Sequence, residues 1–327
     1  MLSKEISKEL FKSFITIAVF LFVAVPQVSA NSIVDWLFPK KNWLEKIKAD
    51  RIIPVGYIED FYPFSYSTTT IPPSGFSVEF TKMLVAKIDE KIRFRSIIPK
   101  FKIISNNSVF SSSYPEIRNK EIAIECNASL ALSQKHPDVI FSKPFFISTI
   151  HVLSKRNQQV RNLQAMKNKL FLAQGNEFQE YLEQRLNNEL KLNIGIIPTN
   201  SIQEAGIKLD QREAIGIIGD ALRIFNIIYA LPDPENYAVN AKSLGEIAYV
   251  CILLAQETEL KEIVNSSIDE ILKSEEYQKL YYRWFIQPAK DLNIALNYPM
   301  PNALQELIIK TNGNINPKLT GLDLLNK

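Results

Sequence analysis

Few residues of this 327-residue chain have the types and spacing that catalysis or metal binding requires. Its two histidines, His136 and His151, have no metal-ligating partner three or four positions away, and its two cysteines, Cys126 and Cys251, are not a pair at zinc spacing. The G-x-S-x-G motif of hydrolases and the G-x-x-x-x-G-K phosphate loop are both absent. The sequence therefore predicts no metal and no cofactor, and it favours a function other than catalysis.

The N-terminal segment has the features of a signal peptide. Three lysines within residues 1–12 precede the run Phe14–Val25, which is apolar except for Thr16, and the small-x-small sequence Val28-Ser29-Ala30 follows. The run is short for a membrane span and Pro26 ends it, although a permanent N-terminal anchor is the alternative. We expect cleavage after Ala30, export to the periplasm and, because no cysteine is near this junction, no lipid anchor.

The composition indicates a globular protein whose partner is neither a nucleic acid nor an anionic membrane. Apolar residues make up 46% of the chain, and the formal charge of +3 falls to +2 without residues 1–30, which hold three lysines and two glutamates. A charge this close to zero argues against a nucleic acid or an anionic membrane as partner. A remaining chain of about 300 residues usually forms one large or two medium domains.

The predicted elements alternate between strand and helix, which is typical of an α/β fold. An amphipathic stretch in residues 31–50 comes first. A strand at Ile52–Tyr57, a turn-rich loop, a helix with Phe80, Met83, Leu84 and Ile88 on one face, and a strand at Ile92–Ile98 then form a βαβ opening. The further predicted elements are an exposed loop at 105–114, strands at 122–126, 170–173, 194–197, 214–218 and 247–254, helices at 178–190, 202–209, 221–229 and 260–272, a last turn at 280–285, and a tail after Pro288 that wraps a lobe.

Several segments in sequence order resemble the type II periplasmic binding proteins for polar amino acids, solute-binding protein family 3. They cover about 240 residues and comprise Tyr62-Pro63-Phe64-Ser65-Tyr66, Gly75-Phe76-Ser77-Val78-Glu79, residues 139–146, Arg212-Glu213-Ala214 and Tyr281 with Arg283-Trp284-Phe285. The likeness is greatest to the glutamate/aspartate-binding proteins of ABC transporters, through Ile124-Glu125-Cys126, Ala248-Tyr249-Val250-Cys251 and Asp291-Leu292-Asn293-Ile294. These last segments are structural and do not indicate specificity.

This resemblance implies a two-lobed α/β fold, each lobe a mixed, mainly parallel sheet flanked by helices. Lobe 1 would comprise residues 31–148 and 247–327, and lobe 2 residues 149–246. Two hinge strands, Phe146–Leu153 and Ile247–Cys251, would join the lobes. Such a protein captures a solute in the crevice at the carboxyl ends of its strands, and its closed form is read by a separate membrane permease. The resemblance thus implies a monomeric, extracytoplasmic solute-binding protein of an ABC importer.

In lobe 1 the resemblance implies five ligand-binding positions, with residues that depart from the family pattern. Phe61 stands where an aromatic ring often stacks on the ligand, and Ile58 stands where dicarboxylate-specific relatives carry an arginine. Lys135 replaces the arginine that forks onto an α-carboxylate, and a solvated surface lysine is the alternative. Ala128 and Leu130 occupy positions whose backbone and threonine hydroxyl complete the carboxylate site, but Leu130 has no hydroxyl to offer.

In lobe 2 the implied ligand-binding residues are four. Gly175 and Asn176 correspond to an anion-capping turn before a helix, and Asn176 as a simple helix N-cap is the alternative. Glu177 in this turn would repel an anion. The aspartate that holds a ligand ammonium falls on Gly219, with Asp220 one place later; if Asp220 does not reach the cleft, it is the N-cap of the helix at 221–229.

Two alternative functions stay open for this chain. Some relatives on this fold are dehydratases or lyases of small carboxylic acids, for which Glu125, Glu177 and Lys135 would be the acid/base candidates. A sensor or partner-binding protein that has lost the amino-acid site would instead show no ligand-dependent closure.

The two cysteines are predicted to form a disulfide. Cys126 and Cys251 both lie on strands assigned to the hinge side of lobe 1, and the predicted compartment is oxidising. Two buried free thiols are the alternative.

The changed site residues argue against glutamate or aspartate as ligand. Ile58, Lys135 and Gly219 replace the partners of the side-chain carboxylate, the α-carboxylate and the ammonium. An unpaired charge buried on closure costs several kcal/mol. We therefore expect a less charged ligand, such as a monocarboxylate bound by Lys135.

Overall fold

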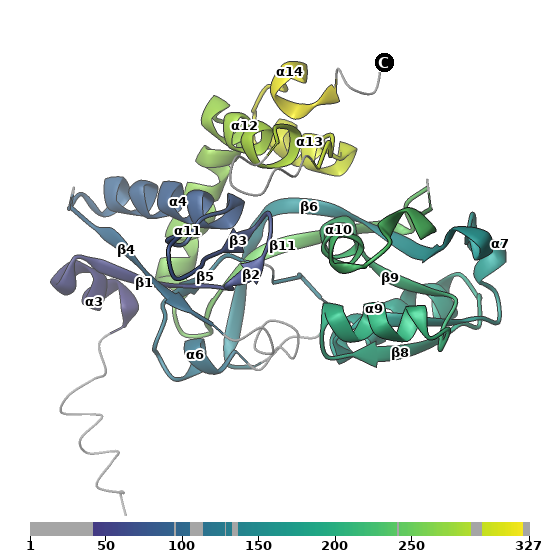
Figure 1. Cartoon of the computed structure of the whole chain (residues 1–327). Coiled ribbons are helices and arrows are strands. Elements are labelled where there is room, and N and C mark those ends of the chain that lie inside the picture. Colours follow the sequence, from purple (N-terminus) through teal and green to yellow (C-terminus); the bar gives the residue numbers. More distant parts are fainter. Residues whose placement is uncertain are drawn as a thin grey trace, which may run out of the picture. The chain divides into compact units, whose positions relative to one another are not determined.

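The computed structural model describes residues 42–94, 96–104, 114–127, 129–132, 137–240, 242–288 and 296–322. The predicted signal peptide lies outside these residues, as do Ala128 and Lys135. Residues 43–327 form one compact unit (Figure 1).

One large mixed sheet runs through this unit. Its strand order is β4-β1-β5-β11-β6-β9-β7-β8, and β10 pairs with β6. β1 is parallel to β4 and β5, and β7 is parallel to β8 and β9, whereas β6 and β11 are antiparallel to their neighbours. The strands of this sheet are β1 (Ile52–Tyr57), β4 (Ile98–Ile103), β5 (Ile124–Glu125), β6 (Val139–Lys155), β7 (Leu170–Gln174), β8 (Gly195–Thr199), β9 (Gly216–Asp220), β10 (Tyr237–Val239) and β11 (Gly245–Leu254). β2 (Asp60–Phe61) and β3 (Ser65–Tyr66) form a separate hairpin.

The long strands β6 and β11 lie side by side, as the predicted hinge strands require. Phe146 is opposite Tyr249 and Ser148 is opposite Ile247 in an antiparallel register. The far end of β6 continues to β9 and β10, so that this strand connects the part of the sheet with β1, β4 and β5 to the part with β7, β8 and β9 (Figure 1). The division into lobes at residues 148 and 247 stays a prediction.

The helices cover the sheet with their apolar faces. α11 packs against both α4 and β6, and α12 packs against α4 and α14, which lies near α13 (Figure 1). The long helices each bury one stripe, in α11 for example Leu260, Val264, Ile268 and Ile271. The α-helices are α3 (Trp43–Asp50), α4 (Phe76–Ile92), α6 (Pro115–Arg118), α7 (Leu163–Met166), α8 (Asn176–Leu182), α9 (Ile202–Asp210), α10 (Ala221–Ala230), α11 (Thr258–Leu272), α12 (Glu275–Tyr281), α13 (Asn302–Lys310) and α14 (Pro317–Thr320). Wider π-type turns, Glu183–Glu189 and Tyr282–Ile286, continue α8 and α12, and short 3-10 turns lie at Arg156–Gln158 and Pro234–Asn236.

The strand predicted at Ile92–Ile98 is wrong. α4 continues to Ile92 and ends at Arg93, which has a left-handed backbone (φ 61°), and the strand that follows is β4, which begins only at Ile98. β4 is an edge strand, where Pro99 can be accommodated because one side of the strand needs no ladder partner. Its apolar residues are partly exposed, and this weakens the pattern that identifies a buried strand.

The C-terminal tail is more helical than its composition indicates. It contains α13 and α14, which we did not predict from the Asn- and Pro-rich sequence after Pro288. α13 buries only Leu304 and Ile308, one pair at i and i+4, so its apolar signal is short.

The predicted disulfide between Cys126 and Cys251 is confirmed. It joins the residue after β5 to β11, next to the point where Glu125 and Ile252 pair. Both cysteines are buried, with exposed fractions of 2% and 0%. The bond therefore fixes β11 to the β5 end of the sheet from inside the core.

Candidate functional site

The predicted ligand residues lie at the carboxyl ends of two parallel strand pairs, β1 with β5 and β7 with β9. Ile58 comes directly after β1, Gly175 directly after β7, and Asp220 is the last residue of β9. The segment around Leu130 follows β5. In open α/β sheets, ligands bind outside these ends, where loops and helix N-termini converge.

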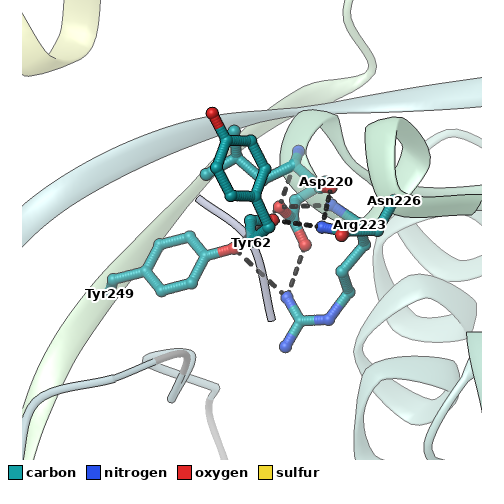
Figure 2. A network of polar contacts seen from close by, with 6 residues as sticks. Tyr62, Asp220, Arg223, Asn226 and Tyr249 are labelled. Carbon is teal, nitrogen blue, oxygen red and sulfur yellow. Dashed lines mark hydrogen bonds and ion pairs between the residues drawn. The ribbon is translucent and has the colours of Figure 1, made fainter. Parts of the chain in front are cut away.

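One arginine, Arg223 in the first turn of α10, lies at the centre of the described part of this region. Its guanidinium carbon is 5.5 Å from the centroid of the Phe61 ring and 6.0 Å from that of Tyr249. Nη1 donates to the Asp220 carboxylate and to the Tyr249 hydroxyl, at 3.3 Å in the latter case. None of these four residues is more than 2% exposed. We call Phe61, Asp220, Arg223 and Tyr249 the Arg223 cluster, and Figure 2 shows the last three of these residues.

Asp220 receives hydrogen bonds on both carboxylate oxygens. Oδ1 accepts from the Leu222 amide at 3.1 Å, the Arg223 amide at 3.4 Å and the Tyr249 hydroxyl at 2.7 Å, while Oδ2 accepts from Arg223 Nη1. Asp220 is thus the N-cap of α10, as one of our two expectations had it, and at the same time the partner of a buried cation. The negative charge also suits the positive end of the helix dipole.

Burial and neighbouring groups shift the pKa values of Tyr249 and Arg223. Burial raises the pKa of Tyr249 well above its usual range, and the nearby Asp220 charge acts in the same direction. For Arg223, burial alone would lower the pKa, but Asp220 and the Tyr249 oxygen raise it above its ordinary value. Tyr249 is consequently a neutral hydrogen-bond donor and Arg223 a permanent cation.

A second contact from α10 reaches the same loop. Asn226, one turn beyond Arg223, donates from Nδ2 to the Tyr62 carbonyl at 2.5 Å (Figure 2). Phe61 and Tyr62 belong to predicted lobe 1 and α10 to predicted lobe 2. In this structure, two side chains of α10 therefore hold adjacent residues of the β2–β3 hairpin.

Three other predicted ligand positions are buried and face packed surroundings. Ile58 is 1% exposed, and its carbonyl accepts from Ser65 Oγ. Leu130 forms a bridge with Tyr249, so its backbone lies against β11. At Gly219 a Cβ would lie 3.3 Å from Ile224 side-chain atoms of α10, so a larger residue there would meet this helix.

The turn after β7 differs from the expectation for Asn176. α8 begins at Asn176 and its N-cap is Gly175, whose φ is +85°, so Asn176 is not the N-cap. Asn176 is exposed, and the Gly175 amide donates to the Thr199 carbonyl at 3.0 Å. The Glu177 side chain lies outside what the structure describes.

The remaining candidates for chemistry lie apart from the Arg223 cluster. Glu125 is 1% exposed and accepts from the Asn127 amide at 2.6 Å and from the Ser129 hydroxyl. His151 bonds Thr149 and the Asn240 carbonyl. Among the described residues, no group of three or more His, Cys, Asp or Glu could hold a metal, and no described helix has the length and apolarity of a membrane span.

Three cavities lined by described residues lie away from the Arg223 cluster. Their volumes are about 530, 710 and 470 Å³, and they adjoin Arg156, Arg118 and Met83 respectively. None of these three includes a residue of the cluster. The guanidinium of Arg223, rather than an empty space, occupies the centre of the cluster.

Sequence reasoning missed Arg223, Asn226 and the polar role of Tyr249. A signal was present, because Arg223 and Asn226 are the only polar residues of the α10 sequence ALRIFNIIYA apart from Tyr229 near its end. With Asp220 they recur every three residues and thus share one helix face. A lone charge on an apolar helix usually has a buried partner.

Two comparisons relate this chain to known sequences. Residues 53–287 match the model of "Bacterial extracellular solute-binding proteins, family 3". The L-glutamate/L-aspartate-binding protein of Pseudomonas aeruginosa is 25% identical over 266 residues, which cover 81% of this chain and 87% of the relative. The glutamate/aspartate import solute-binding protein of Escherichia coli is 23% identical over 270 residues, which cover 82% and 88%.

Solved structures share the fold at lower identity. ArgBP from T. maritima, in a mutant form, has a TM-score of 0.56 at 18% identity and covers 74% of this chain and 98% of that one. An ancestral amino acid-binding protein, described as a precursor of cyclohexadienyl dehydratase, has a TM-score of 0.58 at 17% identity, with coverages of 74% and 98%. These values confirm the predicted two-lobed α/β architecture.

Proposed function

Because this chain belongs to the bacterial extracellular solute-binding proteins of family 3, we propose that it captures a small polar or amino-acid-like solute for an ABC importer. It has the fold of type II periplasmic binding proteins. The solute is held between lobe 1, residues 31–148 and 247–327, and lobe 2, residues 149–246. Bending at β6 and β11 closes the lobes, and a separate permease reads the closed form.

The observation that supports this proposal most is the meeting of Phe61 and Asp220. These residues come from the two predicted lobes, and the family resemblance assigned both to the ligand site. Both contact the same buried guanidinium. An aromatic face and a carboxylate that meet around one polar group are the kind of surroundings that a solute cleft provides.

The protein acts outside the cytoplasm and as a monomer in this proposal. Its signal peptide is removed after Ala30, and the permease and ATPase of the importer are separate chains. The named relatives are binding proteins, and we assign no catalysis to this chain. Glu125, the described acid/base candidate, is fully engaged by its own segment through Asn127 and Ser129.

Glutamate and aspartate are not tight ligands in this proposal, although they are named for the relatives. Ile58 offers no charge for a side-chain carboxylate. Asp220, one place after the predicted ammonium position at Gly219, already pairs with Arg223. Losing one charge-assisted contact of this kind costs about 2–5 kcal/mol, or roughly 30- to 3,000-fold in affinity.

A thermal-shift screen of the exported protein tests the function. The panel contains amino acids, small carboxylates, amines and oligopeptides, and a solute at about 100 times its Kd should add roughly 2.7 kcal/mol of stability. Calorimetric titration with glutamate and aspartate follows. A Kd in the low micromolar range for either one would contradict the specificity, and a panel without any stabilising solute would contradict solute capture.

A further inference from the structure

The Arg223 cluster resembles an occupied binding site in which the occupant belongs to the chain itself. The guanidinium carbon lies 5.5 Å from the Phe61 ring centroid. The guanidinium also pairs with Asp220 and donates from Nη1 to the Tyr249 hydroxyl at 3.3 Å (Figure 2). The aromatic face, the carboxylate and the hydroxyl come from β2, the end of β9 and β11. All of these groups are complementary to a cation, and the cation present is Arg223.

We infer that the Arg223 guanidinium is a tethered cation that occupies this protein's own cation-binding position, so that the captured solute carries no ammonium or guanidinium group there. This inference rests on the proposed solute capture and narrows its substrate class. It makes Arg223 a specificity-determining residue and favours neutral solutes and carboxylates without an amine.

The hydrogen bonds of Asp220 are the first reason. A carboxylate offers about four lone-pair sites, and Asp220 accepts four hydrogen bonds, from two backbone amides of α10, from Tyr249 and from Arg223. Three of these donors share Oδ1, so a solute ammonium could approach only Oδ2, where it would lie beside the Arg223 guanidinium or have to displace it. The two amides are fixed by the helix, and Arg223 is joined to the same turn.

Charge is the second reason. Asp220 and Arg223 are 0% and 2% exposed and neutralise each other, while Tyr249 remains uncharged. A further cation brought beside them would leave one positive charge without a partner among Asp220, Arg223 and Tyr249, away from water. Such an uncompensated buried charge is strongly unfavourable. A solute ammonium is therefore disfavoured in two ways: Arg223 repels it, and Asp220, which would be its partner, is already paired.

The experiment replaces the tethered cation with a free one. Arg223→Ala removes the atoms beyond Cβ, which correspond to ethylguanidinium, and leaves Phe61, Asp220 and Tyr249 in place. We expect ethylguanidinium to raise the unfolding midpoint of the exported Arg223→Ala protein by about 3 °C at ten times its Kd. The wild-type protein should show no such shift.

Two variants control for unspecific effects of the probe. Asp220→Asn added to Arg223→Ala removes the carboxylate and should abolish the shift. Arg185→Ala removes another partly buried lobe-2 arginine, whose Nε donates to the Leu244 carbonyl at 3.4 Å, and should not bind the probe. Equal shifts in Arg185→Ala and Arg223→Ala, or none in a folded Arg223→Ala protein, would overturn the inference.

The wild-type protein provides a second test that does not depend on the folding of Arg223→Ala. Arginine, lysine and glutamate should not stabilise it. If one of them does, and Asp220→Asn abolishes the effect, the cation position is open and the inference is wrong.

If Arg223→Ala binds ethylguanidinium while no solute in the full panel stabilises the wild type, solute capture fails but the tethered cation stands. If an amine-free solute binds the wild type while folded Arg223→Ala does not bind ethylguanidinium, solute capture stands and the tethered cation fails.

Discussion

At the scale of single residues, the buried Asp220–Arg223 pair combines a large cost of removing two charges from water with a large mutual attraction. Removing both charges from water costs several kcal/mol each, and their mutual attraction returns this only when their hydrogen bonds are satisfied. The two backbone amides and the Tyr249 hydroxyl supply those bonds to Asp220. A change to one partner should therefore be much more harmful than a change to both.

We expect Arg223→Met to lower the free energy of unfolding by about 3–5 kcal/mol, because it leaves the Asp220 carboxylate buried without its cation. Asp220→Asn in the same background should restore part of this loss, although Asn caps α10 less well against the dipole. Urea unfolding of the wild type, both single variants and the double variant gives the coupling energy. Additive losses in this cycle would show that the pair is not coupled.

Buried tyrosines make the stability fall at high pH. Burial and the neighbouring Tyr66 raise the pKa of Tyr62 to about 12, and burial raises the pKa values of Tyr277 and Tyr281 well above 10. A raised folded-state pKa gives stability that is present below pH 10, the unfolded value, and is lost as the pH rises toward the folded value. The loss approaches 1.4 kcal/mol per pH unit for each such tyrosine.

Denaturant unfolding at pH 9, 10 and 11 measures this loss, and absorbance at 295 nm follows tyrosinate in the native protein. Tyr62→Phe should reduce the slope of stability against pH above pH 10. A native protein in which Tyr62 ionises near pH 10 would contradict the prediction.

At the scale of elements, the disulfide ties the short strand β5 to β11. Two paired residues alone would hold β5 weakly, but Cys126 follows it directly and is bonded to Cys251 in the core. The cysteines are 125 positions apart, and the intervening chain includes the whole of predicted lobe 2. Cross-linking so long a segment removes much of the entropy of the unfolded chain.

We expect Cys126→Ala/Cys251→Ala to lower the free energy of unfolding by about 2–5 kcal/mol, and about 5 kcal/mol is the chain-entropy upper value for this loop length. Chemical denaturation of the variant and of the oxidised wild type gives the difference. The reduced wild type is the matched control and should unfold at nearly the same denaturant concentration as the variant. Equal stability with and without the bond would contradict the prediction.

The sequence predicted those elements whose apolar pattern is undisturbed by exposure or tertiary context. β1 was predicted with its observed bounds, Ile52–Tyr57, because it is buried between β4 and β5. β4 was misplaced because an edge strand with Pro99 and two lysines lacks that pattern. Phe61 and Asp220 could be proposed for the site by likeness, but their meeting at Arg223 depends on how separate elements pack, which no local pattern contains.

At the scale of the whole molecule, the first described helix is fixed by a residue more than two hundred positions later. The Trp43 amide, at the start of α3, donates to both Glu257 carboxylate oxygens at 3.1 and 3.0 Å. Trp43, Leu44 and Ile47 then pack into the core. Glu257 follows β11, so the beginning of α3 is joined to the segment after this strand.

This attachment allows a sharp prediction for export. We expect the exported protein to begin at Asn31, by cleavage after Ala30, and to unfold at the same midpoint as a chain that begins at Asn42. Both chains retain Trp43 and its Glu257 acceptor, and both retain the buried residues of α3, Trp43, Leu44 and Ile47. Mass spectrometry of the exported protein gives its first residue, and thermal unfolding compares the two chains. Retention of Met1, or a start far from Asn31, would contradict cleavage, whereas a lower midpoint for the shorter chain would show that residues 31–41 contribute to the stability of the folded unit.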